Sequence, residues 1–187
     1  MNIKQPPFVL FYKGNLNLLN IQEEFIYLTG SYETKSINEY INSLKNKDNI
    51  TFINLFWNGL ERKILKRLIK NKSKIVILLP CGIEWGIKNL NLAEFESENC
   101  LFISEYPDEY HCTKNSFIAR NRINACFSKK LILLSSLDKK FNGVINEFLD
   151  QGKDIECLLF NDHLNNDQNI DLINEGATLI NKNLEIC

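Results

Sequence analysis

The chain lacks the features that would assign it to a membrane, secreted or metal-bound class. No apolar run is long enough to cross a bilayer, and the N-terminal MNIKQPPFVL has neither the continuous apolar core nor the cleavage site of a signal peptide. The six cysteines include no CxxC pair and no metal-finger spacing, so we expect reduced, mostly buried thiols. These absences predict a cytoplasmic protein with no membrane contact and no metal.

Sequence signs of catalysis are also missing. The chain has no Walker loop and no Pro-Gly-Gly-x-Gly-Thr motif of nucleotide phosphoribohydrolases. Glu84, Glu105 and Asp108 lie near expected strand ends without a defined spacing, and the two histidines, His111 and His163, are far apart in sequence. We therefore expect a protein that is not an enzyme, with no catalytic residues and no cofactor.

The fractions of hydrophobic and charged residues are typical of one globular domain. Of 187 residues, 44% are hydrophobic and 24% are charged, which is enough apolar material for a core. The net charge of −1 hides an asymmetry, because residues 62–74 carry seven Lys or Arg and no acid, whereas the chain from residue 147 onward is acidic. Arg62, Lys66 and Lys70 line one side of an expected helix, where they form either a basic patch for a polyanion or a solvated outer face.

Apolar patterning predicts strands that alternate with helices. We expect strands at 8–12, 24–30, 50–56, 74–80, 100–104, 131–136, 156–160 and 177–180, and helices at 34–46, 60–71, 117–127, 142–151 and 167–176, with 84–99 mostly irregular. This alternation indicates an α/β fold with a doubly wound, mostly parallel sheet, in a single domain over 1–187. Residues 1–22 are expected to form an N-terminal extension that packs on the sheet.

A cluster of polar residues lies on the helix expected at 117–127, between two strands. At about 100° per residue, Phe117, Arg120 and Asn121 share one face, and Arg122 lies about 160° away from Arg120. We expect Arg120 and Asn121 to face a phosphate or nucleic-acid ligand and Phe117 to stack on a base. Arg122 is expected to pair with Glu105 and hold the loop to the sheet.

Two turns at strand ends are further candidates for ligand contact. Gly30 and Ser31 end the second strand, where backbone N–H groups and a hydroxyl can meet a phosphate, and Tyr32 can stack on a base. The turn at Asn58 and Gly59 follows the next strand.

Several sequence segments occur in one characteristic order along the chain. They are QPPFVLFYKGNLNLL (5–19), TGS (29–31), NGL (58–60), IVILLPCGIE (75–84), ISEYP (103–107), FIARNRINACFSKKLILLSS (117–136) and LINEGATLI (172–180). Their order and their amino-acid sequences resemble those of the DNA-processing protein A family (DprA, also called Smf) over nearly the whole chain.

The resemblance implies a Rossmann-like core that binds single-stranded DNA without catalysis, usually as a homodimer. It also implies delivery of that DNA to the RecA recombinase in natural transformation or recombination. Binding would use a basic pocket made by loops at the carboxyl ends of the strands. The positions implied are Gly30, Ser31, Tyr32, Asn58, Gly59, Phe117, Arg120, Asn121 and Arg122.

The chain departs from the family pattern in its loops. Tyr32 stands where the family has an arginine, the second glycine and the acid after Asn58 are replaced, and Asn161-Asp162 replaces a Pro-Gly. The family's winged-helix domain is not expected in this sequence. These departures leave two alternatives open: a nucleotide-sensing module of the same fold superfamily, or a paralogue that acts in dimerisation or partner binding.

Overall fold

Eight strands form one sheet in the computed structural model, which describes residues 5–20, 22–57 and 59–180. Their order is β1-β5-β4-β3-β2-β6-β7-β8, and every neighbouring pair is parallel except β1 with β5. The strands are β1 (Phe11–Gly14), β2 (Glu24–Thr29), β3 (Ile50–Asn54), β4 (Lys74–Leu79), β5 (Cys100–Ser104), β6 (Lys130–Leu133), β7 (Asp154–Leu158) and β8 (Thr178–Ile180). The predicted doubly wound, mostly parallel sheet is confirmed.

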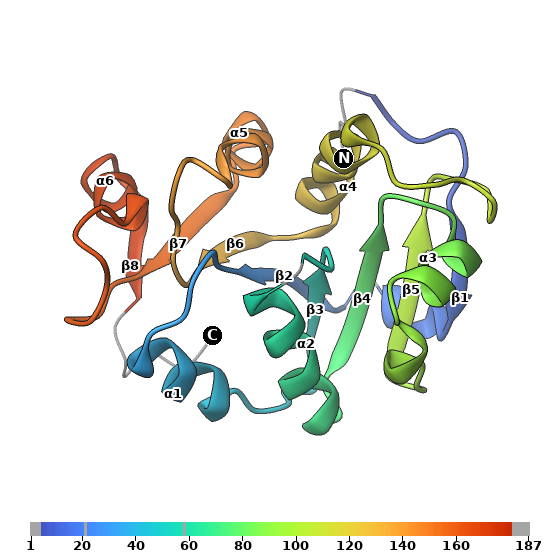
Figure 1. Cartoon of the computed structure of the whole chain (residues 1–187), viewed down its shortest axis with the longest axis horizontal. Helices are drawn as coiled ribbons and strands as arrows, with labels where there is room; N and C mark the ends of the chain where they lie inside the picture. The colour runs from blue at the N-terminus through green and yellow to red at the C-terminus, as the bar shows by residue number, and fades with distance from the viewer. Residues whose placement is uncertain (1–4, 21, 58, 181–187) are drawn as a thin grey trace.

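Helices cover both faces of this sheet (Figure 1). Apolar side chains of α1, α2 and α3 join one buried cluster, and those of α4, α5 and α6 join a second cluster on the opposite face. The helices are α1 (Lys35–Ser43), α2 (Leu60–Lys70), α3 (Ile83–Asn89), α4 (Lys114–Phe127), α5 (Asn142–Asp150) and α6 (Gln168–Asn174), with 3-10 turns η1 (Leu16–Leu19) and η2 (Ala93–Phe95). Because both faces are covered, β3, β4 and β5 are buried almost throughout, as the continuous apolar run at 74–80 predicted for β4.

Strand β2 is the point where the winding direction changes. From β2 the chain builds β3, β4 and β5 to one side, and it then returns to place β6 on the other side of β2. The carboxyl ends of β2 and β6 are therefore adjacent, and in open α/β sheets such a switch point is the usual position of a ligand crevice.

The first strand differs from its predicted position. We expected a strand at 8–12, but β1 spans Phe11–Gly14 and pairs antiparallel with β5, Phe11 opposite Ser104. β5 ends at Ser104, so residues 5–10 have no partner strand, and Phe8 is fully exposed. The N-terminal segment thus contributes an edge strand.

Helix α3 lies where an irregular segment was expected. Gly82 at its start and Gly86 within it weaken the helical pattern in the sequence. Space beside Gly86 is tight, because a Cβ there would lie 3.0 Å from Leu79 Cδ1 and 3.2 Å from Cys81 Sγ. Close packing of α3 on β4, which no local pattern reveals, explains the glycine.

Candidate nucleic-acid interface

The Gly30–Tyr32 turn at the switch point uses its donors internally. The backbone N–H of Ser31 donates to both the carbonyl and the hydroxyl of Ser135 at 3.1 Å, and the N–H of Tyr32 donates to the same hydroxyl at 3.1 Å. Gly30 is needed for close approach, because a Cβ there would lie 2.6 Å from Leu60 Cδ2. In this structure the turn binds the loop after β6. A phosphate site requires N–H groups that face solvent, and the N–H groups of Ser31 and Tyr32 do not.

Tyr32 is also held by internal contacts. Its hydroxyl donates to the carboxylate of Asp167, the N-cap residue of α6, and accepts the N–H of Leu164 at 3.1 Å. Burial and this bond to Asp167 raise the pKa of Tyr32 well above its ordinary value. His163 closes the same region, with Nε2 2.9 Å from the Leu134 carbonyl oxygen. The chain's own side chains therefore fill the switch point.

Arg120 lies in the core, and the face assigned to it from helical spacing is wrong. The side chain is 2% exposed, and its Nη1 donates to the carbonyl oxygens of Leu55 and of Leu78, the latter at 3.2 Å. The buried stripe of α4 contains Ser116, Arg120, Ile123, Asn124 and Ala125. Small and polar residues on this stripe leave room for the guanidinium, a packing arrangement that a hydrophobicity pattern does not detect.

A buried carboxylate accompanies the buried guanidinium. Glu61, 1% exposed, accepts hydrogen bonds from Tyr27 Oη at 2.5 Å, Thr29 Oγ1 at 2.6 Å and the N–H of Trp57 at 3.0 Å. Burial raises the pKa of Glu61, and burial lowers the pKa of Arg120, while the opposite charges of the two groups partly offset both shifts. This buried network fixes the backbone of Trp57 where the loop after β3 leaves the sheet.

Arg122 has the structural role that was predicted for it. Its guanidinium donates to both carboxylate oxygens of Glu105, with 2.7 Å for the Nη1 contact, and to the carbonyl oxygens of Ala119 and Gln5, each at 2.6 Å. The bond to Glu105 raises the pKa of Arg122. Arg122 thus ties the N-terminal segment and the loop after β5 to α4.

Asn121 and the second turn complete the predicted set. Asn121 is half-buried against the start of α5, where its Nδ2 lies 3.5 Å from the position a Cβ on Gly143 would occupy. Gly59 is exposed at φ 93°, a left-handed backbone that favours glycine, and no atom lies within 4 Å of its ideal Cβ. Asn58 falls outside the described residues.

Phe117 forms part of an aromatic platform, a name we use for Trp57 and Phe117 together. Both side chains are half-buried, and their rings stack with centroids 5.0 Å apart and planes 25° apart. The buried Arg120 guanidinium lies 5.2 Å from the Trp57 ring centroid and 5.3 Å from that of Phe117. On the solvent side, the exposed Lys140 places Nζ 6.0 Å from the Trp57 centroid. Aromatic rings with a neighbouring cation suit a nucleobase and its phosphate.

Sequence reasoning missed Trp57 and Lys140 as site residues. Trp57 was not among the predicted contacts, although an aromatic residue next to Asn58-Gly59 at a strand end was an available signal. Lys140 follows Asp138 and Lys139, which both have φ 55° in the loop after β6. Two consecutive left-handed residues without glycine are costly and are typical of functional loops. Only the fold brings these loops to Phe117.

Three of the five basic side chains of α2 pair with acids from other segments. Arg62 and Lys66 both contact Glu94, the latter at 3.7 Å, and Lys63 pairs with Glu33 at 2.6 Å. Lys70 is exposed at the last turn of the helix, at the end away from the carboxyl edge of the sheet. The geometry therefore favours the solvated-face interpretation of this patch for Arg62 and Lys66.

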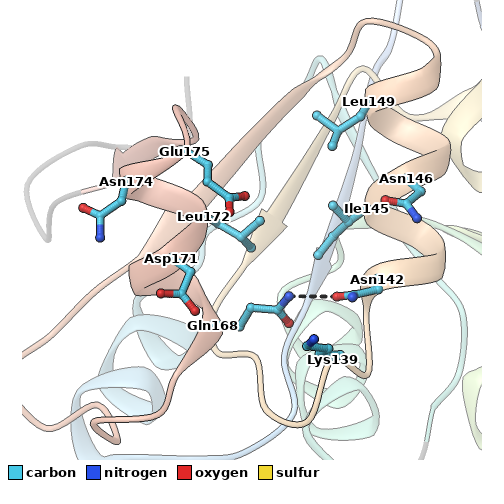
Figure 2. A pocket seen from close by; sticks show the side chains of 10 residues that line it. All are labelled: Lys139, Asn142, Ile145, Asn146, Leu149, Gln168, Asp171, Leu172, Asn174 and Glu175. Atoms are coloured by element: carbon cyan, nitrogen blue, oxygen red, sulfur yellow. Dashed lines mark hydrogen bonds between the residues drawn. The ribbon is translucent and has the colours of Figure 1, made fainter.

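A pocket of about 490 Å³ lies between α5 and α6, away from the platform (Figure 2). Ile145, Leu149 and Leu172 give it an apolar floor, and Gln168 donates to Asn142 Oδ1 across it at 2.8 Å. Its charged lining residues are Asp171 and Glu175 against Lys139 alone. This excess of carboxylates disfavours a polyanion.

A metal site and a membrane-spanning helix are both absent from the part of the chain that the structure describes. Among residues 5–20, 22–57 and 59–180, no group of three or more His, Cys, Asp or Glu side chains is arranged to hold a metal ion. Within the same residues, no helix is both long and apolar enough to span a membrane.

The fold and site define an open, doubly wound α/β protein whose carboxyl edge carries an aromatic platform and lysines. The sequence profile of the DNA recombination-mediator protein A family matches residues 1–187, and the chain belongs to this family. The chain is 25% identical over 194 residues to DNA processing protein DprA of Streptococcus pneumoniae (98% of this chain, 67% of the relative). It is 26% identical over 191 residues to that of Bacillus subtilis (96% and 63%). It thus spans about two thirds of their length.

Solved structures share the fold. DprA of Helicobacter pylori matches with a TM-score of 0.80 at 21% identity, over 95% of this chain and 84% of that one. DprA of Streptococcus pneumoniae matches at 0.77 and 22%, over 93% and 63%. A molybdenum cofactor carrier protein of Chlamydomonas reinhardtii matches at 0.53 and 12%, over 85% and 91%. At these identities the likeness shows the fold alone.

Proposed function

We propose that this chain binds single-stranded DNA at the carboxyl edge of its sheet and acts, without catalysis, as a recombination mediator. Family membership supports this role, and the related Helicobacter pylori protein is one whose structure is described for its single-stranded DNA binding mode. The observation that carries the proposal for this chain is the platform of Trp57 and Phe117 with Lys140 over it. Stacking accepts any base, so it suits binding without sequence preference.

The platform replaces part of the site that the sequence predicted. Phe117 and the exposed Gly59 remain proposed contacts with DNA, and Trp57 and Lys140 join them. Arg120 supports the platform from inside, because its guanidinium lies against both rings. Ser31 and Tyr32 hold the loop after β6, which carries Lys140, the proposed phosphate contact.

The partners of the proposed complex are RecA and a second copy of the chain. Both follow from the family role, in which DNA captured at the edge of the sheet is passed to the recombinase. Light scattering of the purified protein tests the homodimer: a mass near twice the monomer's 21.8 kDa is expected, and a monomer mass at all concentrations contradicts it.

Titration of labelled oligo-dT, followed by fluorescence anisotropy at low salt, tests the DNA site. Trp57→Ala is expected to weaken binding about 5- to 150-fold, because one lost base stack is worth about 1–3 kcal/mol. Lys140→Ala should reduce the slope of log affinity against log salt by about 0.7, the value for one phosphate contact on a single strand.

The chain provides a matched control for Trp57. Trp85 is also half-buried and stacks on His111 at 5.2 Å, but it belongs to α3 rather than to the platform. Trp85→Ala should bind oligo-dT like the unmodified protein, with thermal unfolding used to verify that each variant is folded. Absence of oligo-dT binding at low salt refutes the proposed function. Binding that Trp57→Ala leaves unchanged refutes the platform as the site.

A further inference from the structure

One end of the sheet carries an exposed apolar segment. β1 is the last strand at that end, so its outer side has no partner strand among the described residues (Figure 1). Six of the ten large hydrophobic side chains that are exposed in residues 5–20, 22–57 and 59–180 lie in or beside this strand. We name these six the apolar edge: Phe8, Val9, Leu10, Phe11, Tyr12 and Leu16. Exposed apolar residues are ordinarily scattered singly, and a contiguous patch of them indicates a contact surface.

The apolar edge has much of the area that a contact between subunits requires. Phe8 is fully exposed, Tyr12 is 56% exposed, and the other four are 36–50% exposed. A fully exposed aromatic side chain offers about 200 Å², so the six side chains together present roughly 600 Å². A stable protein contact buries about 800 Å² on each partner. The apolar edge and the backbone beside it therefore supply most of one side of such a contact.

The backbone of β1 is oriented to accept another strand. The N–H of Asn15 donates to the Cys100 carbonyl at 3.3 Å, and hydrogen-bonded residues alternate along an antiparallel pair of strands. Lys13 and Phe11 therefore turn their backbone groups towards β5, whereas Tyr12 turns its N–H and C=O outward. Free backbone groups on an edge strand are a template for pairing with another chain.

The features that normally protect an edge strand are weak in β1. Lys13 is the single charged residue in the segment 8–14, and its ammonium pairs with Glu84 at 3.0 Å and with Glu96 at 3.6 Å. A lysine on an edge discourages pairing through its charge, but this charge is offset by acids of the same subunit. Pro6 and Pro7 precede the segment, so they limit its length without interrupting it.

We propose that β1 pairs antiparallel with β1 of a second copy of this chain, so that the two sheets join across a twofold axis. A strand edge that meets its own copy is self-complementary, as a twofold contact requires. With Tyr12 opposite its counterpart, both outward backbone groups are bonded, and Lys13 lies opposite Phe11 of the second copy rather than a like charge. The same register brings Phe8 towards Leu16 of the second copy. This inference rests on the homodimer of the proposed function and names its contact surface.

The pairing leaves both DNA sites free. β1 is antiparallel to β5, and its copy is antiparallel to β1, so the carboxyl edges of the two subunits point in opposite directions. The aromatic platform of each subunit belongs to the loop after β3 and to α4, which take no part in the contact. Dimerisation and oligo-dT binding can therefore be measured, and can fail, separately.

Light scattering over a series of protein concentrations tests the contact. Tyr12→Pro removes the outward N–H and leaves the hydrogen bonds to β5 in place, because Tyr12 does not donate to β5. The dimer loses two backbone hydrogen bonds, so its dissociation constant should rise about 5- to 150-fold. Phe8→Lys alters a fully exposed position outside the strand, and it should also raise the dissociation constant because a charge replaces an apolar contact. Thermal unfolding verifies that each variant is folded, and Phe8→Lys decides the matter if Tyr12→Pro is not.

Leu149→Lys is the matched control, because Leu149 is 57% exposed and lies in α5, which packs on β6 and β7 away from β1. This variant should dimerise like the unmodified protein. In the unmodified protein, hydrogen exchange at the Tyr12 amide should slow as the concentration rises.

The proposal is overturned if a folded Tyr12→Pro or Phe8→Lys variant dimerises as tightly as the unmodified protein, or if Leu149→Lys dissociates the dimer. In either case the homodimer itself stands, with a different contact surface. A monomer mass for the unmodified protein at all concentrations overturns both the contact and the homodimer, whereas oligo-dT titration still decides the DNA site.

Discussion

Replacement of Arg120 by alanine separates a structural role from direct ligand contact. The change removes a guanidinium that is 2% exposed and serves two strand-end carbonyls, and it leaves the Glu61 carboxylate buried without its nearby positive charge. Loss of one partner from a buried charged cluster typically costs about 3–5 kcal/mol. The cavity left by truncation acts in the same direction, but the two effects are not additive. We expect the free energy of unfolding to fall by about 3–5 kcal/mol.

Urea unfolding followed by circular dichroism measures this loss, provided that the slope with denaturant stays unchanged. Lys114→Ala is the matched control, because Lys114 is exposed in the first turn of the same helix and should change stability by no more than about 0.5 kcal/mol. A loss below about 1 kcal/mol for Arg120→Ala refutes the buried role. If that stable variant also fails to bind oligo-dT, Arg120 contacts the ligand directly, as helical spacing predicted.

Two further predictions concern buried and half-buried charges. The pKa of Glu61 is raised in the folded state, so its contribution to stability is fully present below its unfolded value of about 4.3 and is lost as pH rises through the folded pKa. The free energy of unfolding of the unmodified protein, relative to Glu61→Gln, should therefore decrease across this range in urea titrations, and a difference independent of pH would contradict the raised pKa. For the Arg122–Glu105 pair, 16% and 15% exposed, a double-mutant cycle with alanine should give a coupling of about 1–3 kcal/mol, whereas a coupling near zero would show that the pair is not formed.

The order of strands and helices was predictable because each element has its own hydrophobic period. The strand expected at 74–80 is a continuous apolar run, and β4 confirms it as a central strand with parallel neighbours on both sides. The pairing of Arg122 with Glu105 was also predicted correctly. Helix α3 was missed because its glycines lower helix propensity, and their purpose is close packing on β4.

The candidate site was less predictable, because its parts come from separate loops. Phe117 was identified, but its partner Trp57 is distant in sequence, and Lys140 comes from a third segment. The orientation of Arg120 was wrong because a buried arginine has no hydrophobic signature: its neighbours on the stripe, such as Ser116 and Asn124, are polar too.

The sequence by itself therefore determined the family, the class of fold and the approximate position of most elements, since these depend on local pattern and on recognisable motifs. Only the tertiary structure decided which arginine lies in the core, which turns use their donors internally, and which aromatic residues meet at the edge of the sheet. The physical reason is that burial and hydrogen-bond partners are set by what a neighbouring segment offers. Side chains on one helix face, such as Phe117 and Arg120, take different roles once Trp57 and Glu61 arrive from the loop and helix after β3.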